Sequence, residues 1–443
     1  MTALEIAHRA LELAGGDAEA LVHVERSGMA RFAASEVHQP TLIENMIVQL
    51  RVAANGNVGS AQTNSVDDDA LRTLAERARA AAAPDPDFPG FAEAAKPADV
   101  EGWDEETAAL SPDEQASRAA SAFDVPLPVY GFFTSGATDL ALATTNGFAA
   151  QQRLTDASVR VLAATEGASG WAERTSWRVA DVDPPGAAQE AADKAGRTRE
   201  AVTVEPQRFR AVLEPYAIAE LLQWFAFSAW NGLAFLEERS FFADRLGKRV
   251  LDPKISVVDD RTWDLPRPFD FEGTPTAPLA LVEEGVGRAV CWDRRTAARA
   301  GTQSTGHAGP PAERAWGPYP TALRLAPGDA ESLEELAELV GDGIYVTRVH
   351  YLGIVQPREG VLTGMTRDGT FRIRGGKIAE PLVNLRFTVA MPDLLGEVPG
   401  LTRYTQLCGQ SDFYDERYAI AARVPALATA SFNVTGVGSE PGL

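Results

Sequence analysis

The amino-acid sequence predicts an α+β protein with a mixed α/β domain at residues 1–203 and a mainly antiparallel β domain at residues 204–443. Three observations predict this class. The chain of 443 residues is longer than one hydrophobic core usually supports. Residues 344–388 alternate apolar and polar side chains between glycine-rich turns, as strands of a barrel or a meander do. Residues 221–236 form a dense run of Leu, Phe and Trp, which predicts a buried helix.

The patterns of the first domain switch between helical and strand spacing. Gly15 and Gly16 end an apolar pattern of helical spacing, and Asn55-Gly56-Asn57 is a strong signal for a tight hairpin. An acidic first turn at 67–69 suits the start of the next helix. The predicted elements are a helix at 1–14, strands at 20–25, 46–54 and 58–62, and a helix at 65–83.

Residues 84–128 are rich in Pro, Asp, Glu and Ala, which predicts a long surface connection with one helix at 112–122. The rest of the first domain is predicted as strands at 129–134, 140–145, 158–165 and 171–180, and a helix from 184 to about 200. We expect the domain boundary near residues 202–207.

The second domain begins with a predicted strand at 208–214 and a helix that starts at Pro215. The apolar run of this helix is shorter than the roughly 20 residues that a bilayer span requires, so we interpret it as a buried helix. The remaining predictions are an acidic surface helix at 331–339, a strand at 344–352, a hairpin turning at Gly375-Gly376, and a strand at 383–388.

Composition limits the classes of function. The formal net charge is −21, and so acidic a surface repels phosphate backbones, which argues against nucleic-acid binding. The first residues lack a cationic segment followed by an apolar one, so we expect no secretory signal. Two cysteines in the whole chain suit a reducing cytoplasm.

Apart from its periodicity, the sequence contains residue motifs that resemble those of a known family. Residues 345–388, with Tyr-Val-Thr-Arg-Val-His-Tyr at their start, resemble the C-terminal signature of the TldD/PmbA (TldE) family of metallopeptidase subunits, once described as modulators of DNA gyrase. Further blocks that resemble this family are at 16–20, 31–39, 245–260, 271–276 and 293–306. The resemblance covers nearly the whole chain and implies a role in peptide hydrolysis.

The resemblance also implies where a zinc site would lie. Catalytic members carry a His-Glu-x-x-x-His motif on the apolar helix and a third ligand, a cysteine, far downstream. In this chain one registration of the motif puts Gln223 and Ser228 at the histidine positions, and the other puts Ala229 and Ala234 there. Cys408 matches the third ligand roughly, but a lone thiolate binds zinc poorly and a buried structural role is the alternative. We therefore expect no metal in this chain, and zinc in a TldD-like partner.

Polar residues between the glycine-rich strands are candidates for contact with a substrate in a chamber shared with that partner. The candidates are His350, Arg348, Thr363, Met365, Arg367, Asp368 and His307. Each has a structural alternative: turn chemistry for 363–368, a core or interface histidine for His350, and a surface loop for His307. Arg294, Arg295 and Arg299 are expected in a solvated loop or at a subunit interface, with capture of a substrate carboxylate as the alternative.

The leading hypothesis is a non-catalytic TldE-like subunit of a heterodimeric zinc metallopeptidase that acts on unfolded or precursor peptides in the cytoplasm. In that arrangement the chain would present strand edges to an extended peptide and hold the partner's catalytic helix in place. The alternative is a peptide-binding or assembly protein, such as a homodimer, without a peptidase role. Neither hypothesis involves nucleic acid or a membrane.

Overall fold

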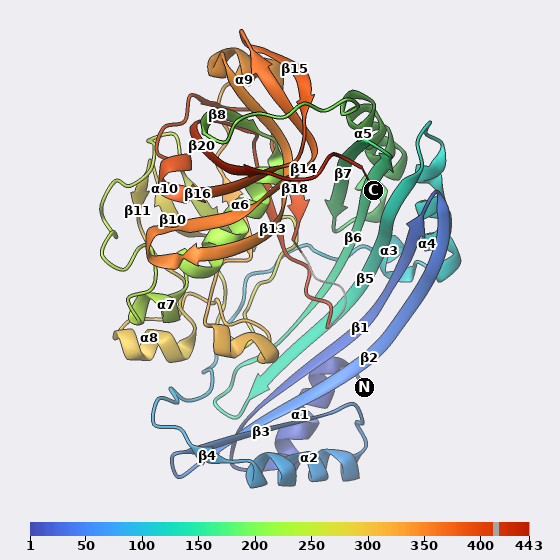
Figure 1. Ribbon diagram of the computed structural model, residues 1–443. Helices are drawn as coiled ribbons and strands as arrows, with labels where there is room; N and C mark the ends of the chain where they lie inside the picture. The colour runs from blue at the N-terminus through green and yellow to red at the C-terminus, as the bar shows by residue number, and fades with distance from the viewer. Residues whose placement is uncertain (411–415, 443) are drawn as a thin grey trace.

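Within residues 1–410 and 416–442, which the computed structural model describes, the strands form three sheets (Figure 1). The first sheet belongs to the N-terminal half and has the order β4-β3-β2-β1-β5-β6-β7, with every neighbouring pair antiparallel. Its strands are β1 Asp17–Ala33, β2 Glu36–Ala54, β3 Asn57–Thr63, β4 Ala83–Pro84, β5 Val129–Thr144, β6 Ala149–Thr165 and β7 Ala168–Ser176.

These strands are much longer than the sequence pattern predicts. The expected strands at 129–134 and 140–145 are one strand, β5, and β2 begins ten residues before Met46. The middle of the sheet carries polar side chains on both faces, such as Thr134 on one and Ser135 on the other, and small residues such as Gly136. The alternation of apolar and polar residues is lost there, although the backbone ladder continues.

Helices cover both ends of the first sheet (Figure 1). At one end α1 (Ala3–Ala14) and α2 (Asp68–Ala80) enclose a core with Val22, Val48 and Leu50. At the other end α5 (Pro184–Arg197) packs on β7. The proline-rich connection contains α3 (Glu105–Ala109), which was not predicted, as well as α4 (Pro112–Ala120) and a 3-10 turn at Ser121–Phe123. The predicted strand at 171–180 is wrong beyond Ser176, where a 3-10 turn at Val179–Asp181 follows.

The second sheet has the order β11-β10-β9-β12-β19-β18. Its strands are β9 Val257–Asp259, β10 Leu279–Glu283, β11 Val286–Gly287, β12 Ala322–Leu325, β18 Gln406–Gly409 and β19 Ala421–Val424.

The third sheet closes on itself. It follows the order β13-β8-β20-β16-β14-β15, and an additional pairing of β13 with β14 closes the first five of these strands into a ring, with β15 at its edge. Of the two predicted arrangements, a barrel or a meander, the closed ring corresponds to the barrel. Its strands are β8 Arg208–Leu213, β13 Gly343–Gln356, β14 Val361–Arg374, β15 Lys377–Leu382, β16 Leu385–Ala390 and β20 Leu427–Val437, with β17 Gly400–Leu401 beside β20. The smaller helices around the two sheets are α8 Arg294–Ala300, α9 Leu333–Val340 and α10 Met391–Leu394, with 3-10 turns at Pro311–Trp316 and Pro357–Glu359.

The predicted apolar helix lies between the second and third sheets. It is α6 (Pro215–Ala229), and its Leu221 and Leu222 share one core cluster with residues of both sheets. The helix does not continue to Leu236. It stops at Trp230, and a separate helix, α7 (Gly232–Leu236), follows because the Asn231 side chain accepts a hydrogen bond from the Ala234 N–H as its N-cap.

No helix among the described residues is long and apolar enough to cross a bilayer. The chain passes from α5 to β8 through residues 198–207, where the domain boundary stays a prediction.

Candidate functional site

A cavity of about 490 Å³ lies where the first sheet meets α6 and the barrel strand β13. It is lined by strands β5, β6 and β7 of the first sheet, by helix α6, by strand β13, and by the end of strand β18 with the residue that follows it. The lining residues are Phe132, Arg160, Trp171, Glu173, Tyr216, Glu220, Trp224, Arg348, His350, Gly409 and Gln410.

The sheet side of the cavity is a cross-strand row. Phe132 on β5 pairs in register with Arg160 on β6, which pairs with Glu173 on β7, so the three side chains share one face. The Arg160 Nε lies 3.3 Å from the Glu173 carboxylate, and its Nη2 donates to the Gly409 carbonyl at 2.7 Å. The Gly409 N–H donates back to Glu173 at 2.8 Å. Burial raises the pKa of Glu173, although Arg160 and the Gly409 N–H oppose that shift.

The α6 side presents Tyr216, Glu220 and Trp224, which are spaced four residues apart and so lie on one face of the helix. Burial raises the pKa of Glu220 to about 7; Arg348 opposes this shift, Glu173 adds to it, and Arg160 opposes it. Within the described part of the chain, the Glu220 carboxylate has no hydrogen-bond or ion-pair partner. The Trp224 side chain beside it is exposed.

The β13 side contains two of the predicted residues, Arg348 and His350. The Arg348 Nε donates to the Asp368 carboxylate at 2.6 Å, and its guanidinium lies 3.8 Å from the centre of the Trp171 ring. Burial, with Arg348 and Arg367, lowers the pKa of His350, so the imidazole is neutral at physiological pH. Asp368 is itself buried and holds Arg348 in place, so it does not face the cavity directly.

The other predicted residues of β14 lie outside the cavity lining. The Thr363 hydroxyl donates to the Phe387 carbonyl at 2.9 Å, across the pairing of β14 with β16. A Cβ on Gly438 would come within 2.3 Å of the Met365 methyl carbon, so Met365 packs against the chain after β20. Arg367 pairs in register with Arg348, and its buried Nε has no hydrogen-bond partner among the residues that the structure describes.

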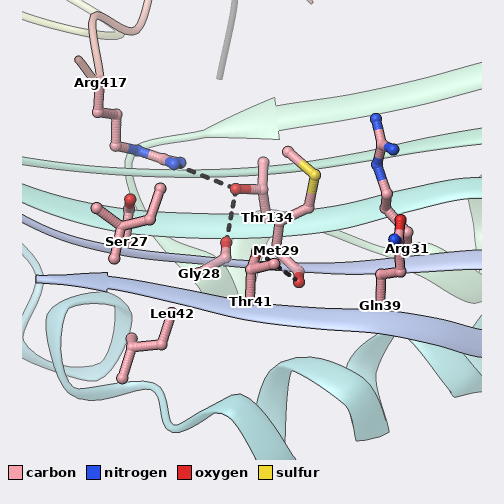
Figure 2. Close-up of a pocket in the computed structure, with 10 residues that line it drawn as sticks. Ser27, Gly28, Met29, Arg31, Gln39, Thr41, Leu42, Thr134 and Arg417 are labelled. Carbon is pink, nitrogen blue, oxygen red and sulfur yellow. Dashed lines mark hydrogen bonds between the residues drawn. The ribbon is translucent and has the colours of Figure 1, made fainter. Parts of the chain in front are cut away.

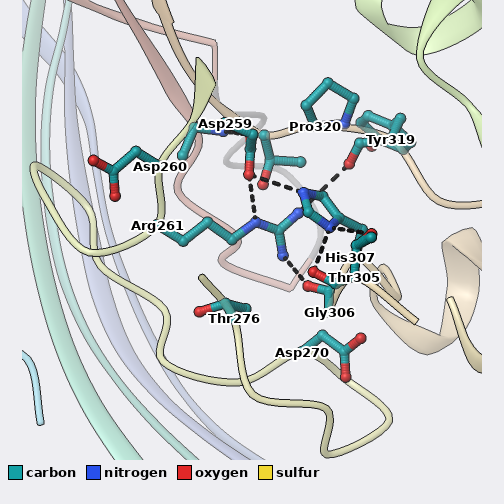
Figure 3. A network of polar contacts seen from close by, with 12 residues as sticks. Asp259, Asp260, Arg261, Asp270, Thr276, Thr305, Gly306, His307, Tyr319 and Pro320 are labelled. Carbon is teal, nitrogen blue, oxygen red and sulfur yellow. Dashed lines mark hydrogen bonds and ion pairs between the residues drawn. The ribbon is translucent and has the colours of Figure 1, made fainter. Parts of the chain in front are cut away.

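His307 lies in a different place, inside a network of polar contacts (Figure 3). It is 2% exposed, so the expectation of a surface loop is wrong. Its Nε2 lies 3.0 Å from Asp259, which also accepts from Arg261 Nε at 3.1 Å, and its Nδ1 lies 2.8 Å from the Thr305 carbonyl. Burial and Arg261 lower the pKa of His307, whereas Arg261 and His307 hold the pKa of Asp259 well below its usual range against the effect of burial. The network connects β9 to the glycine-rich loop at 304–309.

The residues at the implied zinc positions do not fit a zinc ion. The Gln223 amide donates to the Pro320 carbonyl, and the buried Ser228 hydroxyl donates to the Phe225 carbonyl. Cys408 is 0% exposed, and burial raises the pKa of its thiol well above the usual value, whereas zinc needs a thiolate. Across residues 1–410 and 416–442, no three His, Cys, Asp or Glu side chains form a group able to hold a metal ion.

Cys291 is buried and forms an isolated bridge with Asn231. One smaller expectation is corrected. The arginines at 294, 295 and 299 belong to α8 and not to a solvated loop. Arg295 forms an ion pair with Asp85, and Arg294 donates to the carbonyl of Phe91, so both connect α8 to the proline-rich connection.

A second cavity, of about 370 Å³, lies on the same face of the first sheet (Figure 2). Its lining comes from β1, β2 and β5 and includes Arg31, Gln39 and Met29. Arg417 closes one side, where it donates to the Thr134 hydroxyl at 3.1 Å (Figure 2). Arg31 pairs in register with both Phe132 and Gln39, so the row that begins in the first cavity continues into the second.

The sequence pattern missed Glu173, Arg160 and Glu220. The signal for Glu220 was available, since it is the one acidic residue within the apolar helix at 215–229. Arg160 and Glu173 become neighbours only through the register of β6 with β7, which no local pattern shows.

Comparison with known proteins assigns the class of this architecture. The crystal structure of TldE from Thermococcus kodakarensis superposes with a TM-score of 0.84 at 17% identity, covering 98% of this chain and 99% of that chain. A protein named metalloprotease from Methanothermobacter thermautotrophicus is 28% identical over 229 residues, which are 49% of this chain and 49% of that protein. The metalloprotease PmbA homolog of Haemophilus influenzae is 28% identical over 174 residues, 38% of this chain and 35% of that protein. The match thus spans about half the length, or less, of these two relatives.

The fold is therefore that of a TldE-like protein. The model of the PmbA/TldA metallopeptidase C-terminal domain matches residues 206–436, and that of the PmbA/TldA metallopeptidase domain 1 matches residues 18–82. The chain belongs to the PmbA/TldD metallopeptidase family.

Proposed function

We propose that this chain is a non-catalytic, TldE-like subunit that pairs with a TldD-like, zinc-containing subunit in the cytoplasm and contributes to the hydrolysis of unfolded or precursor peptides. The observation that carries this proposal is the chemistry of α6 and Cys408. If the family motif lies on α6 and α7, its two imidazole positions correspond to Gln223 and Ser228 in one registration or to Ala229 and Ala234 in the other, and the Cys408 thiol is protonated, whereas a zinc peptidase needs two imidazoles and a thiolate. A chain of this family without its own metal ligands depends on a partner for the chemical step.

The two cavities support a role in holding the peptide. They lie along one cross-strand row, from Glu173 through Phe132 and Arg31 to Gln39. Neighbouring strands are about 4.8 Å apart, so the row spans about 19 Å, the length of about six residues of extended chain. A peptide lying across the sheet would therefore contact both cavities at once.

The test is reconstitution with a TldD-like subunit. Mass measurement by size-exclusion chromatography with light scattering is expected to give a stable pair, and cleavage of an unstructured peptide is expected to need both chains. Metal analysis of the isolated chain is expected to find far less than one zinc per chain. Peptide cleavage by this chain alone, restored by added zinc, contradicts the proposal.

The same experiment distinguishes the proposed subunit from the alternative, a peptide-binding or assembly protein. A chain that binds the peptide but neither pairs with the TldD-like subunit nor raises its activity is a peptide-binding or assembly protein. In that case the isolated chain keeps its cavities and its affinity for the peptide.

A further inference from the structure

The 490 Å³ cavity contains one carboxylate, Glu220, that has no hydrogen-bond or ion-pair partner among the described residues. Arg160 faces Glu173, and Arg348 faces Asp368, so each of these two guanidinium groups already has a carboxylate. Glu220 is the remaining charged group of the lining. Among the described residues, Glu220 is therefore the carboxylate of the lining that forms no ion pair with a guanidinium group.

Two of the aromatic rings that line the cavity already contact an arginine, whereas the Trp224 ring is exposed. The Trp171 ring already lies under Arg348, and the Phe132 ring lies 5.5 Å from the Arg160 guanidinium. Trp224 follows Glu220 by one helical turn on α6, and its side chain is 38% exposed. A carboxylate and an indole face on one side of a helix form a receptor for a positive charge, since both attract a cation.

We propose that this cavity is a subsite for a positively charged residue of the peptide, a Lys or Arg side chain or the N-terminal ammonium group, held between the Glu220 carboxylate and the Trp224 ring. The inference rests on the proposed peptide-binding role and names one feature of the peptide that the site selects. The site disfavours an acidic residue at this position, because its carboxylate would face Glu220 while Arg160 and Arg348 are already paired with Glu173 and Asp368.

The groups that face Glu220 set the pH range in which the subsite works. They are Glu173 and Arg160 from the sheet, Arg348 and neutral His350 from β13, and Tyr216 from its own helix. Burial raises the pKa of Glu220 to about 7, so the carboxylate is protonated below that pH and ionised above it. Binding of a cation is therefore stronger on the alkaline side of neutrality.

The experiment compares two capped pentapeptides, Ac-Ala-Ala-Lys-Ala-Ala-amide and the same peptide with Gln in place of Lys, by isothermal titration calorimetry on the isolated chain. At about pH 8 and about 50 mM NaCl, the Lys peptide is expected to bind about tenfold more tightly than the Gln peptide. In Glu220→Gln the ratio is expected to fall to about one, and in Trp224→Leu to an intermediate value. The matched control, Glu76→Gln, removes the same charge from an exposed position of α2 and is expected to keep the tenfold ratio.

The same titrations of the unaltered chain at a lower pH test the subsite without any variant. At about pH 5.5 its preference for the Lys peptide is expected to disappear, because Glu220 is then neutral. Equal binding of the two peptides at about pH 8, or no measurable binding of the Lys peptide, overturns the subsite. A Lys preference that Glu220→Gln retains overturns it as well. These results are independent of pairing with a TldD-like subunit, so a failure of the subsite and a failure of the proposed function are told apart.

Discussion

Asp259 and Glu220 are both largely removed from water, but different groups face them. Asp259 accepts hydrogen bonds from Arg261, His307 and the Ala322 N–H, and these partners stabilise its charged form. Glu220 lacks such a partner in the described chain, so its charged form is destabilised. The same chemical group therefore serves as a structural anchor at one position and as a candidate binding group at the other.

Asp259→Asn is expected to destabilise the protein by about 3–5 kcal/mol, because the buried Arg261 guanidinium loses its carboxylate. Urea unfolding at neutral pH measures the change, with the exposed Asp69→Asn as a control expected to change stability by less than about 1 kcal/mol.

The folded pKa of Asp259 lies below the unfolded value, so the unfolded state takes up the proton first. The stability difference between the two forms is therefore largest above about pH 4 and shrinks as the pH falls below it. An Asn variant as stable as the parent protein would show that the network contributes nothing.

For Glu220, the change of stability with pH has the opposite sign. Its folded pKa of about 7 lies above the unfolded value, so the native state holds the proton more tightly. Relative to Glu220→Gln, the unaltered protein is expected to lose stability as the pH rises from about 4.5 to about 7. Urea unfolding of both proteins at the two ends of this range checks the expectation. A constant difference between them would mean that Glu220 titrates as it does in water.

At the scale of elements, small residues set how closely helices approach the first sheet. A Cβ on Gly170 of β7 would lie 2.1 Å from the Ala191 carbonyl oxygen of α5, a backbone atom that cannot turn aside. A Cβ on Gly59 of β3 would likewise lie 2.1 Å from the Ala78 carbonyl oxygen of α2. The two helices therefore lie on the sheet at glycines, where no side chain separates them from the strand.

Gly170→Ala is expected to destabilise the protein by about 1–3 kcal/mol, because α5 must move away from β7. Gly196 supplies a matched control on the same helix, where an added Cβ meets nothing within 4 Å. Gly196→Ala is expected to stabilise the protein by about 0.5–1 kcal/mol through helix propensity. Thermal unfolding is expected to show a lower melting temperature for Gly170→Ala and a higher one for Gly196→Ala. Equal shifts of the melting temperature would contradict the close approach of α5 at Gly170.

Local signals explain which elements the sequence predicted. The helices α1 and α4 have complete capping boxes at Thr2 and Ser111, and the hairpin of β2 and β3 has the Asn55-Gly56 turn. The end of α6 was not predicted because a distant contact contributes to it: the Asn231 side chain donates to the Trp316 carbonyl. The predicted Arg348 and His350 line the cavity, whereas Glu173 and Glu220 reach it through strand register and helix docking, which a single sequence does not display.

At the scale of the whole molecule, Arg417 connects the two halves of the chain. Its guanidinium forms two bonds of 2.7 Å with Asp156 on β6, and its N–H donates to Glu25 on β1. These contacts hold the segment before β19 on the first sheet, beside the second cavity. The arrangement of the second cavity therefore depends on this contact.

Arg417→Ala is expected to cost about 3–5 kcal/mol, because the buried Asp156 carboxylate loses its guanidinium. Urea unfolding measures the cost, and limited proteolysis is expected to show faster cleavage near residue 417. Arg403→Ala is the control, since its ion pair with Glu331 is exposed and worth less than about 1 kcal/mol. Equal stability of the two variants would mean that the halves are held together elsewhere.

The order of strands in the barrel has a consequence for biosynthesis. Strand β8 ends at Leu213 and its neighbour β20 begins only at Leu427, so β8 is made long before this neighbour. Until residues 427–437 have left the ribosome, β8 and β16 each present an open edge that can pair with another nascent chain. We therefore expect a truncation before Leu427 to yield insoluble aggregates when expressed, and the full chain to depend on chaperones during the interval before β20 is inserted.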